Sequence, residues 1–346
     1  MQSMTPLHTA PAPKAAFGGT VSDHMLTATY DRGRWSNYEV GPFEPITLSP
    51  TALGLHYGQS IFEGMKAFRM VDGSVSIFRI ARHWQRFTRS AQRMCMPVIP
   101  EELFTEGLKA LVCRDAGWVP DAPESSLYIR PFLFATEARF GVAVSEEYLF
   151  NVFTGPVQRL YEKGLRVKVE DRYIRAAPGG VGAAKCAGNY GGALYPTQLA
   201  KAAGFDQVLW TDGSPELNIE ESGTMNVAFV IGGKLVTPAL SDTILDGVTR
   251  DSFLTIAREW SMPVEERKIS AFELLEASGR GILTEAFGFG TAAVVAPIEE
   301  IAVGEKTIRV PSLTDGSFCL KAKQYLNDIR RGAAEDRYGW NTVLAV

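Results

Sequence analysis

Cysteine and histidine are scarce in this chain, and their spacing excludes the commonest metal and disulfide sites. The 346 residues include four cysteines and four histidines. No C-x-x-C pair and no H-E-x-x-H motif occurs among them, and these are the spacings typical of zinc sites and redox motifs. We therefore expect no metal ligands and four reduced thiols, at Cys95, Cys113, Cys186 and Cys319.

The chain also lacks an excess of charge of one sign and any long apolar run. Its net charge is -4 with both signs scattered, so it offers no basic surface for nucleic acid and no polybasic membrane anchor. No apolar run could span a bilayer, and residues 1–16 resemble neither a signal peptide nor a transit peptide. We expect a flexible N-terminal arm at residues 1–16 and a cytoplasmic protein whose partners are small molecules or protein chains.

What the chain contains is the composition of a globular protein large enough for two domains. It is 46% hydrophobic and 21% charged, within the ordinary range of globular chains. Predicted strands and helices follow one another without regular β-α-β alternation, which favours the α+β class in each half. Gly and Pro after Phe153 predict a domain connection at residues 154–162, between a small domain (17–153) and a large one (163–346).

Hydrophobic periodicity predicts three main elements in the first half. Apolar residues recur at helical spacing from Ile80 to Met94 and again from Glu101 to Ala116. Leu127 to Phe134 has the pattern of a strand, in which Tyr128 and Arg130 share one face. That face therefore presents a hydroxyl and a guanidinium together.

The second half contains a hairpin signal and a capping signal. The segments 225–231 and 234–237 are separated only by Gly232-Gly233, which predicts a hairpin with a primed turn. Helices are expected at 248–260 and 271–276, and Ser270-Ala-Phe-Glu273 has the form of a capping box.

A glycine-rich stretch from Gly179 to Gly192 holds one lysine, Lys185, and one tyrosine, Tyr190. It is not a P-loop, because no Ser or Thr follows a lysine at the required spacing, and no G-x-G-x-x-G clearly links a strand to a helix. On composition alone, a surface loop with a solvated lysine explains it better than a site does.

Six ordered segments change this interpretation, because together they resemble one family over nearly the whole chain after Phe17. The chain is similar to the branched-chain-amino-acid aminotransferases, which are fold-type IV pyridoxal-phosphate enzymes. The segments are Phe17-Gly with Ser22-Asp-His-Met25, Leu55-His-Tyr-Gly-Gln-Ser-Ile-Phe-Glu-Gly-Met-Lys-Ala-Phe68, Leu127-Tyr-Ile-Arg-Pro131, the Lys185 stretch, Glu220-Glu-Ser-Gly-Thr-Met-Asn226, and Gly247-Val-Thr-Arg250 with Phe287-Gly-Phe-Gly-Thr-Ala292. The resemblance implies a smaller N-terminal α/β domain, a larger C-terminal pseudo-barrel domain, and a homodimer in which each subunit helps close the other's pocket.

The resemblance also assigns residues to the cofactor, pyridoxal 5′-phosphate. Lys185 would attach it covalently and act as general base and acid, Tyr190 would contact its phenolic oxygen, and Glu221 would pair with its pyridine nitrogen. Glu220, facing the opposite way on the same strand, is expected to be a solvated charge. The phosphate would be bound by residues that offer a guanidinium or helix- and turn-end N–H groups: Arg79, Val248, Thr249 and Thr291.

A second set is implied for the substrate. An apolar wall would favour branched aliphatic side chains, and Arg130 would bind the extra carboxylate of glutamate in the second half-reaction. The expected residues are Phe17, Tyr57, Phe62, Tyr128, Arg130, Thr224 and Ala292, with Val142 nearby. Tyr161 aligns only with a shift of one residue, and Ala293-Val-Val-Ala296 stands where vertebrate relatives have a C-x-x-C pair.

The predicted function is therefore reversible transfer of the amino group of L-leucine, L-isoleucine or L-valine to 2-oxoglutarate. Two enzymatic alternatives share the fold, a D-amino-acid aminotransferase and an aminodeoxychorismate lyase. The segments Tyr128-Ile-Arg130 and Phe62-Glu-Gly-Met-Lys66 follow the branched-chain pattern instead. A non-catalytic binding protein on the same scaffold would be expected to lack Lys185 or Glu221, and both are present.

Overall fold

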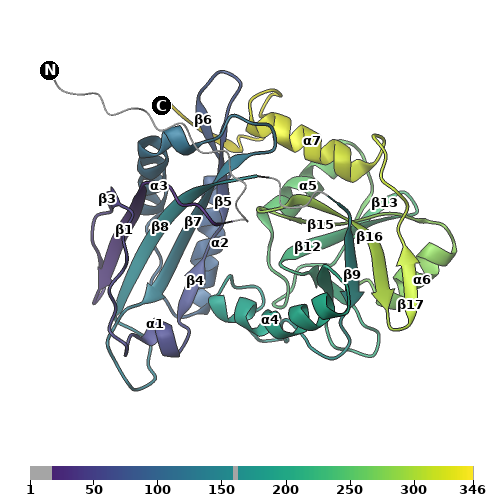
Figure 1. The fold of residues 1–346 in the computed structure, drawn as a ribbon, viewed down its shortest axis with the longest axis horizontal. Helices are drawn as coiled ribbons and strands as arrows, with labels where there is room; N and C mark the ends of the chain where they lie inside the picture. Colours follow the sequence, from purple (N-terminus) through teal and green to yellow (C-terminus); the bar gives the residue numbers. More distant parts are fainter. Residues whose placement is uncertain (1–17, 159–162, 346) are drawn as a thin grey trace. The chain divides into compact units, whose positions relative to one another are not determined.

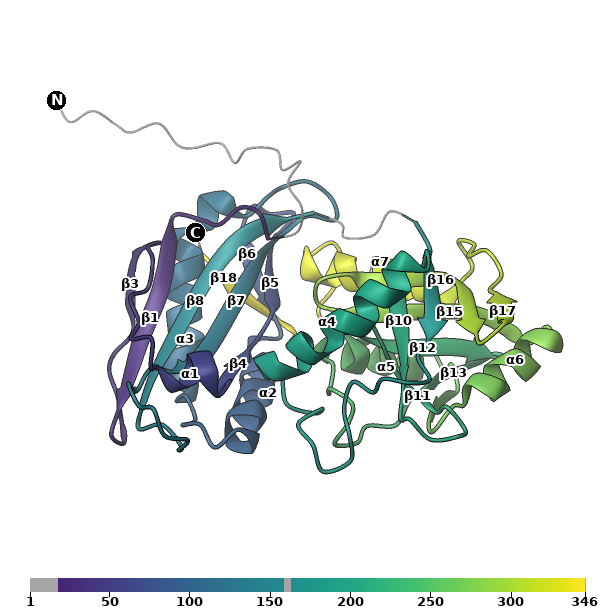
Figure 2. The same cartoon turned by 60° about the horizontal axis from the view of Figure 1, so that its bottom comes forward.

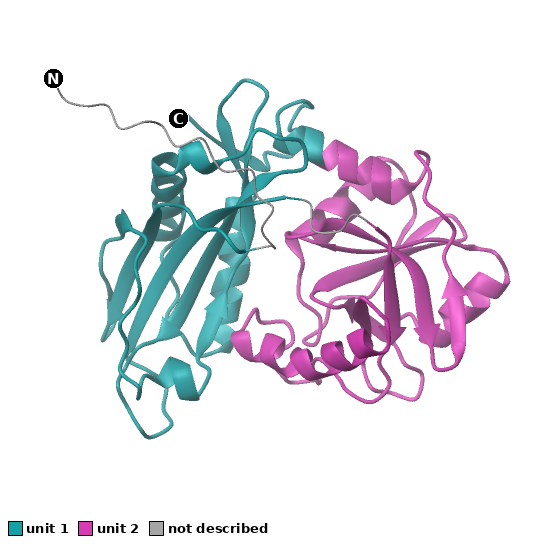
Figure 3. Cartoon of the chain, in the orientation of Figure 1, with its two compact units in different colours: residues 1–160, 327–346 teal, residues 161–326 magenta. Residues whose placement is uncertain are grey.

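A computed structural model describes residues 18–158 and 163–345, which form two compact units. The first unit comprises residues 1–160 and 327–346, and the second comprises residues 161–326 (Figure 3). The last twenty residues of the chain thus belong to the first unit, and nothing in their sequence pattern indicates this. The domain connection at 154–162 stays a prediction, and residues 159–162, with Tyr161 among them, lie outside the described residues.

The first unit is built on a nine-stranded sheet with the strand order β18-β6-β5-β7-β8-β1-β2, in which β3 also pairs with β1 and β4 with β7 (Figure 1). These strands pair in antiparallel fashion. The strands are β1 (His24–Asp31), β2 (Arg34–Trp35), β3 (Glu39–Pro42), β4 (Ser60–Phe62), β5 (Met65–Arg69), β6 (Val75–Phe78), β7 (Ser126–Ala135), β8 (Glu147–Val157) and β18 (Asn341–Leu344).

The two long helices of this unit, α2 (Ile80–Arg93) and α3 (Glu101–Arg114), pack on the sheet around an aromatic core. The unit also contains the short helix α1 (Leu53–His56) and the 3-10 turn η1 (Ala116–Trp118). Phe87 of α2, Phe104 of α3 and Phe150 of β8 are fully buried, with ring centroids 5.7 to 5.9 Å apart. The helices predicted from Ile80 and from Glu101, and the strand predicted at 127–134, are confirmed within two residues at each end.

β8 continues to Val157, so the first residues of the predicted domain connection at 154–162 belong to a strand. β1 pairs with β8 only as far as Phe153, whereas β7 pairs with it through Val157. Pro156 therefore lies where β8 has a neighbour on one side only, and a proline is tolerated at such an edge position because it lacks the N–H of a central strand.

The second unit contains a barrel. Its sheet has the order β11-β10-β9-β16-β15-β12-β13-β14, with β17 on β16, and an additional pairing of β11 with β12 closes a ring of six strands (Figure 2). This closure confirms the expected pseudo-barrel and the α+β class. The strands are β9 (Leu165–Val169), β10 (Gln207–Thr211), β11 (Ile219–Ser222), β12 (Met225–Ile231), β13 (Lys234–Thr237), β14 (Val264–Glu266), β15 (Leu283–Gly290), β16 (Val294–Val303) and β17 (Lys306–Arg309).

Four helices accompany the barrel: α4 (Ala187–Ala202), α5 (Val248–Glu259), α6 (Ala271–Gly279) and α7 (Phe318–Arg330). The predicted hairpin is confirmed, since β12 and β13 pair across Gly232 and Gly233, whose φ angles of 57° and 78° suit a primed turn. One of the two hydrogen bonds of the capping box is confirmed, because Ser270 Oγ accepts a 3.0 Å hydrogen bond from the Glu273 N–H.

Candidate active site

Lys185 lies at the end of the glycine-rich loop, two residues before α4 begins. Its amine donates a 2.7 Å hydrogen bond to the phenolic oxygen of Tyr190, in the first turns of α4. Asn189 holds the loop against the helix, because its amide donates 2.9 Å hydrogen bonds to the carbonyls of Val181 and Ala184. The lysine is therefore partly buried and points at a hydroxyl instead of extending into solvent.

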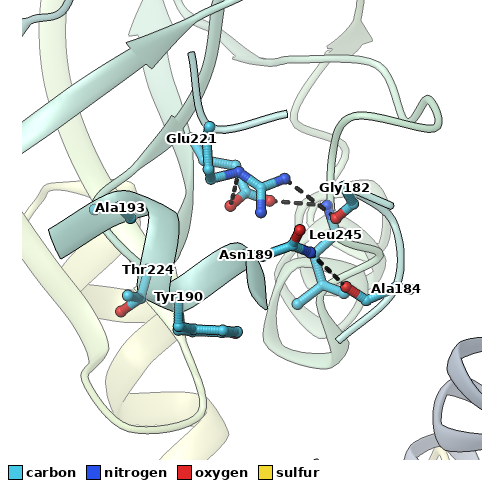
Figure 4. Close-up of a pocket in the computed structure, with 10 residues that line it drawn as sticks. Gly182, Ala184, Asn189, Tyr190, Ala193, Glu221, Thr224 and Leu245 are labelled. Carbon is cyan, nitrogen blue, oxygen red and sulfur yellow. Dashed lines mark hydrogen bonds and ion pairs between the residues drawn. The ribbon is translucent and has the colours of Figure 1, made fainter. Parts of the chain in front are cut away.

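Glu221 supplies the negative charge of the same region. It lies on β11 and is 4% exposed. One carboxylate oxygen accepts a 2.8 Å hydrogen bond from the Leu245 N–H, and the other lies 3.2 Å from Nε of Arg175 in an ion pair that lacks hydrogen-bond geometry. Tyr190, Glu221, Thr224 and Leu245 line one pocket, together with Arg175, Gly182, Ala184, Asn189, Ala193 and Gly223 (Figure 4).

The neighbouring Glu220 is not the solvated charge that strand alternation predicted. It is buried, and Thr243 donates a 2.5 Å hydrogen bond to it. The alternation itself is confirmed, because the two carboxylates bond different partners, but inside a closed barrel the second side of the strand is covered as well. Burial raises the pKa of Glu220, and the hydrogen bond from Thr243 only partly offsets this effect.

Two turns and one helix start lie at the same end of the barrel. The turn at Gly223-Thr224 joins β11 to β12, and residues 291–293 form the turn between β15 and β16. Since Asn226 pairs with Phe289 in antiparallel register, the two turns are neighbours. Within the motif Phe287-Gly-Phe-Gly-Thr-Ala292, the residues up to Gly290 belong to β15, and only Thr291 and Ala292 lie in the turn.

The start of α5 is fixed to this end of the barrel by Asn226. Its amide donates a 2.9 Å hydrogen bond to the Leu245 carbonyl, and a β-carbon at Gly247 would overlap its side-chain oxygen. Val248 and Thr249 form the first turn of the helix and are buried. The first N–H groups of an α-helix have no partner within the helix, so this turn can bind an anion.

The first unit has a pocket of its own, around Tyr128 and Arg130 of β7. Nη2 of Arg130 donates a 3.0 Å hydrogen bond to the Tyr128 hydroxyl, and the guanidinium carbon lies 4.8 Å from the ring centroid of Phe62. The buried Nε of Arg130 has no hydrogen-bond partner among the described residues. The pocket is lined by Tyr128 and Arg130 with Gly18, Thr20, Val21, Phe153, Thr154, Gly155 and Val157.

Comparison with known proteins assigns the chain to a family. The sequence profile of amino-transferase class IV matches residues 60–301. Two relatives from Bacillus subtilis (strain 168), branched-chain-amino-acid aminotransferase 2 and branched-chain-amino-acid transaminase 1, are 42% and 44% identical to this chain, each over 95% of it and over 92% and 94% of their own lengths. This chain belongs to the branched-chain-amino-acid aminotransferases of class IV.

A solved structure supports the same assignment at the level of the fold. The T.th. branched-chain amino acid aminotransferase, complexed with N-(5′-phosphopyridoxyl)-L-glutamate, superposes with a TM-score of 0.71 at 26% identity. The match covers 91% of this chain and 97% of that one. The fold-type IV architecture expected for this aminotransferase is thereby confirmed, and it is a pyridoxal-phosphate-dependent transaminase.

The residues of the second unit fit this cofactor. A primary amine at Lys185, a hydroxyl within hydrogen-bond distance of it at Tyr190, and a buried carboxylate at Glu221 surround or line one pocket. The carboxylate can meet a protonated pyridine nitrogen, and Arg175, which forms an ion pair with it, lines the same pocket. Among the residues of 18–158 and 163–345, no cluster of three His, Cys, Asp or Glu side chains could hold a metal ion.

The residues predicted for the substrate and the phosphate fall into three groups. Thr224 lines the Glu221 pocket, and Thr291 and Ala292 form the adjacent turn. Tyr128, Arg130 and Phe62 lie together in the first unit, where Arg79 is the N-cap residue of α2. Tyr57 and Val142 are exposed and do not line the Arg130 pocket, while Phe17 lies outside the described residues.

Sequence reasoning missed Arg175 and Gly64. Arg175 pairs with Glu221 and also donates to the carbonyls of Gly182 and Thr243, so it ties the lysine loop to the carboxylate strand. A β-carbon at Gly64 would overlap the Tyr128 hydroxyl and lie 2.7 Å from its ring carbon Cζ. Gly64 stands within the segment Phe62-Glu-Gly-Met-Lys66 that carried the resemblance, which was the available signal for it.

Proposed function

We propose that this aminotransferase moves the amino group of L-leucine, L-isoleucine or L-valine to 2-oxoglutarate by a ping-pong reaction. The observation that carries the proposal is the single pocket that Tyr190 and Glu221 line beside the Lys185 amine. The relatives named above carry the same activity in their names. The products are a branched 2-oxo acid and L-glutamate.

In this proposal each residue assigned to the cofactor has one task. Lys185 would hold the cofactor covalently, and its free amine would move the proton of the substrate's α-carbon. Tyr190 keeps the amine in place through its 2.7 Å hydrogen bond. Glu221 would keep a proton on the pyridine nitrogen, and pyridoxal phosphate, when bound, would supply the electron sink for the substrate's α-carbon. Arg79, Val248, Thr249 and Thr291 would bind the phosphate.

Arg130 is proposed to bind the side-chain carboxylate of glutamate and 2-oxoglutarate. Within the described chain it donates a hydrogen bond to the Tyr128 hydroxyl, and its Nε is buried without a partner there. The remaining N–H groups of this guanidinium can therefore donate hydrogen bonds to a carboxylate. When an aliphatic substrate is bound, the Tyr128 hydroxyl and the faces of the Phe62 and Tyr128 rings would keep the charge stabilised.

The activity is tested by the visible spectrum of the purified protein. We expect a cofactor absorbance band that L-leucine and L-glutamate each shift to the amino form of the cofactor, while Lys185→Ala shows no such cycle. A band that answers only D-alanine would favour the D-amino-acid aminotransferase. Release of pyruvate from aminodeoxychorismate would favour the lyase, and absence of any band after reconstitution would contradict the proposal.

The task of Arg130 is tested by separating the two half-reactions. Arg130→Ala should slow the half-reaction with L-glutamate by about tenfold or more beyond its effect on L-leucine, because a charged hydrogen bond is lost only with the acidic substrate. Arg139→Ala, an exposed arginine that pairs with Glu137 in the same unit, is the control. Equal losses with both amino acids would refute this role.

We also propose that the aminotransferase is a homodimer in the cytoplasm. The exposed large apolar side chains of the first unit include Leu55, Tyr57, Phe140, Val142 and Val144, and three more are exposed on α4, at Leu194, Tyr195 and Leu199. Exposed apolar groups of this size favour association with another chain.

The four cysteines are free thiols, in keeping with a reducing compartment. No helix in the described part of the chain is long and apolar enough to cross a membrane.

The dimer is tested by sedimentation. Phe140→Asp, at a residue that is 86% exposed, should shift the protein toward monomer. Val71→Asp, at an isolated exposed valine in the turn between β5 and β6, should leave the assembly unchanged. A wild-type protein that sediments as a monomer at micromolar concentration would contradict the proposal.

A further inference from the structure

Arg330 is a buried arginine without a carboxylate partner among the described residues. It is the last residue of α7 and is 2% exposed. Its Nε and Nη1 atoms are buried and make no hydrogen bond to any described residue. The pKa of Arg330 is lowered to about 9, first by burial and then by the positive charge of Arg79. Both arginines belong to the first unit, and the positive charge of Arg79 disfavours the charged form of Arg330.

Aromatic rings connect these two arginines. The Arg330 guanidinium lies 4.4 Å from the ring centroid of Phe78 and 5.3 Å from that of Phe68. The ring of Trp340 lies 5.7 Å from Phe78, and the guanidinium of Arg79 lies 4.9 Å from the Trp340 centroid. The rings stabilise both cations but do not neutralise them.

The C-terminal segment contacts both β6 and Arg79, the residue at the start of α2. β18 pairs with β6 in antiparallel register, and the Ser76 hydroxyl donates a 2.8 Å hydrogen bond to the Arg330 carbonyl. The Arg79 N–H donates a 2.6 Å hydrogen bond to the Trp340 carbonyl. Arg79 itself adopts φ 55° and ψ 41°, a left-handed conformation that is uncommon for a residue other than glycine and must be held by its surroundings.

We propose that Arg330 is a positioning residue for a phosphate group, adding a second positive charge behind Arg79 while Trp340 of the same segment fixes the direction of the Arg79 guanidinium. The proposal rests on the proposed role of Arg79 toward the cofactor. The ligand it requires is a phosphate monoester or free phosphate, because a doubly charged anion gains more from an additional positive charge than a singly charged anion does.

A purely structural role for Arg330 makes a different prediction. The helix C-terminus of α7 and the two phenylalanine rings already favour a cation at this position. If these contacts were its whole purpose, removing the charge would lower stability and weaken every ligand alike. If the charge of Arg330 instead helps to bind an anion, removing it should weaken the binding only of ligands that carry a phosphate.

The experiment compares two aldehydes that differ only by the phosphate. Pyridoxal phosphate and pyridoxal are titrated into cofactor-free wild-type protein and into the variants Arg330→Gln and Arg330→Lys, and binding is followed by absorbance. Arg337→Gln removes the same charge from the same C-terminal segment at an exposed ion pair with Glu335, so it is the matched control. Thermal unfolding of each variant verifies that it is folded. Competition by inorganic phosphate separates free phosphate from the cofactor's phosphate as the anion bound.

In Arg330→Gln we expect the preference for pyridoxal phosphate over pyridoxal to fall by about tenfold or more, with the affinity for pyridoxal changed by no more than about twofold. Arg330→Lys, titrated below neutral pH so that the buried amine stays protonated, should retain most of the preference, and Arg337→Gln should retain all of it. The loss in Arg330→Gln should shrink at high salt, because salt screens the interaction. Inorganic phosphate should compete less well with pyridoxal phosphate in Arg330→Gln than in wild type.

Three results would overturn the inference: equal weakening of both aldehydes in Arg330→Gln, an equal effect of Arg337→Gln, or loss of the preference in a folded Arg330→Lys. Should Arg330→Gln not fold, the lysine variant and phosphate competition in the wild type decide. A wild-type protein that binds neither aldehyde would instead contradict the proposed function. The two failures are therefore distinguishable.

Discussion

The amine nitrogen of Lys185 lies 2.7 Å from the phenolic oxygen of Tyr190, and the intervening residues contain the start of α4. The lysine is on the loop side of the helix start and the tyrosine on the helix itself. Their contact therefore depends on the way the glycine-rich loop enters the helix, which Asn189 stabilises with two hydrogen bonds to loop carbonyls.

Tyr190→Phe should weaken cofactor binding by about fivefold to tenfold, because one hydrogen bond contributes about 1 kcal/mol net. Binding of pyridoxal phosphate is followed by absorbance titration. Tyr195→Phe is the control, because it removes a hydroxyl from an exposed tyrosine on the same helix. Similar effects of the two substitutions would show that the Lys185 contact is not the cause.

Glu221→Gln should lower kcat by about 10²-fold or more, because a neutral amide cannot keep the pyridine nitrogen protonated. Glu220→Gln should change kcat by less than about threefold, since Glu220 is directed toward Thr243 and not into the pocket. Steady-state kinetics with L-leucine and 2-oxoglutarate measures both. A larger loss in Glu220→Gln than in Glu221→Gln would reverse the assignment.

The buried carboxyl group of Glu220 should also make the stability of the protein depend on pH. Burial raises the pKa of Glu220, so the stability this group contributes is complete below its unfolded pKa and is lost as the pH rises through its folded pKa. Glu220→Gln should remove that loss. Chemical unfolding at about pH 4.5 and about pH 8 should therefore show a smaller decline for this variant than for the wild type.

Gly64→Ala should damage the Arg130 pocket without unfolding the protein. The added methyl group would displace the Tyr128 ring and break its 3.0 Å hydrogen bond to Arg130. We expect the KM for 2-oxoglutarate to rise by about tenfold, the equivalent of about 1.4 kcal/mol. Gly41→Ala, where an added β-carbon would meet nothing within 4 Å, should leave KM unchanged. An unchanged KM in Gly64→Ala would contradict the role assigned to Tyr128.

Glu63 adjoins this glycine and is fully buried between Arg86 and His83. Its carboxylate lies 2.6 Å from Nε of Arg86 and 2.8 Å from Nδ1 of His83. Burial on its own raises the pKa of Glu63, but the charges and hydrogen bonds of Arg86 and His83 outweigh it and hold that pKa below its usual range. Burial lowers the pKa of His83.

Glu63→Gln should lower the free energy of unfolding at pH 7 by about 3 to 5 kcal/mol, because it leaves the buried Arg86 charge unpaired. The lowered pKa of Glu63 means that its stabilising effect is present above the unfolded pKa and is lost as the pH falls. The difference between variant and wild type should therefore narrow from about pH 7 toward about pH 3 in urea unfolding. Glu106→Gln, at an exposed pair with Lys109, should change stability by less than about 0.5 kcal/mol and is the control.

Local patterns predicted the elements well wherever one residue type or one period decides the conformation. The β12–β13 hairpin followed from two glycines, α2 and α3 from their 3.6-residue period, and the Ser270 cap from its spacing to Glu273. The extension of β8 through Pro156 was missed, because whether a proline is allowed in a strand depends on how many neighbours the strand has at that point.

By itself, the sequence determined the family, the α+β class, and the residue types required for transamination, since an amine, a carboxylate and a guanidinium can be recognised in ordered motifs. Only the tertiary structure decided which groups meet: Arg175 with Glu221, Gly64 with Tyr128, Trp340 with Arg79, and Arg330 with Phe78. These pairs are set by strand order and by burial. A local period specifies which face a side chain occupies, but it cannot specify which distant segment will cover that face.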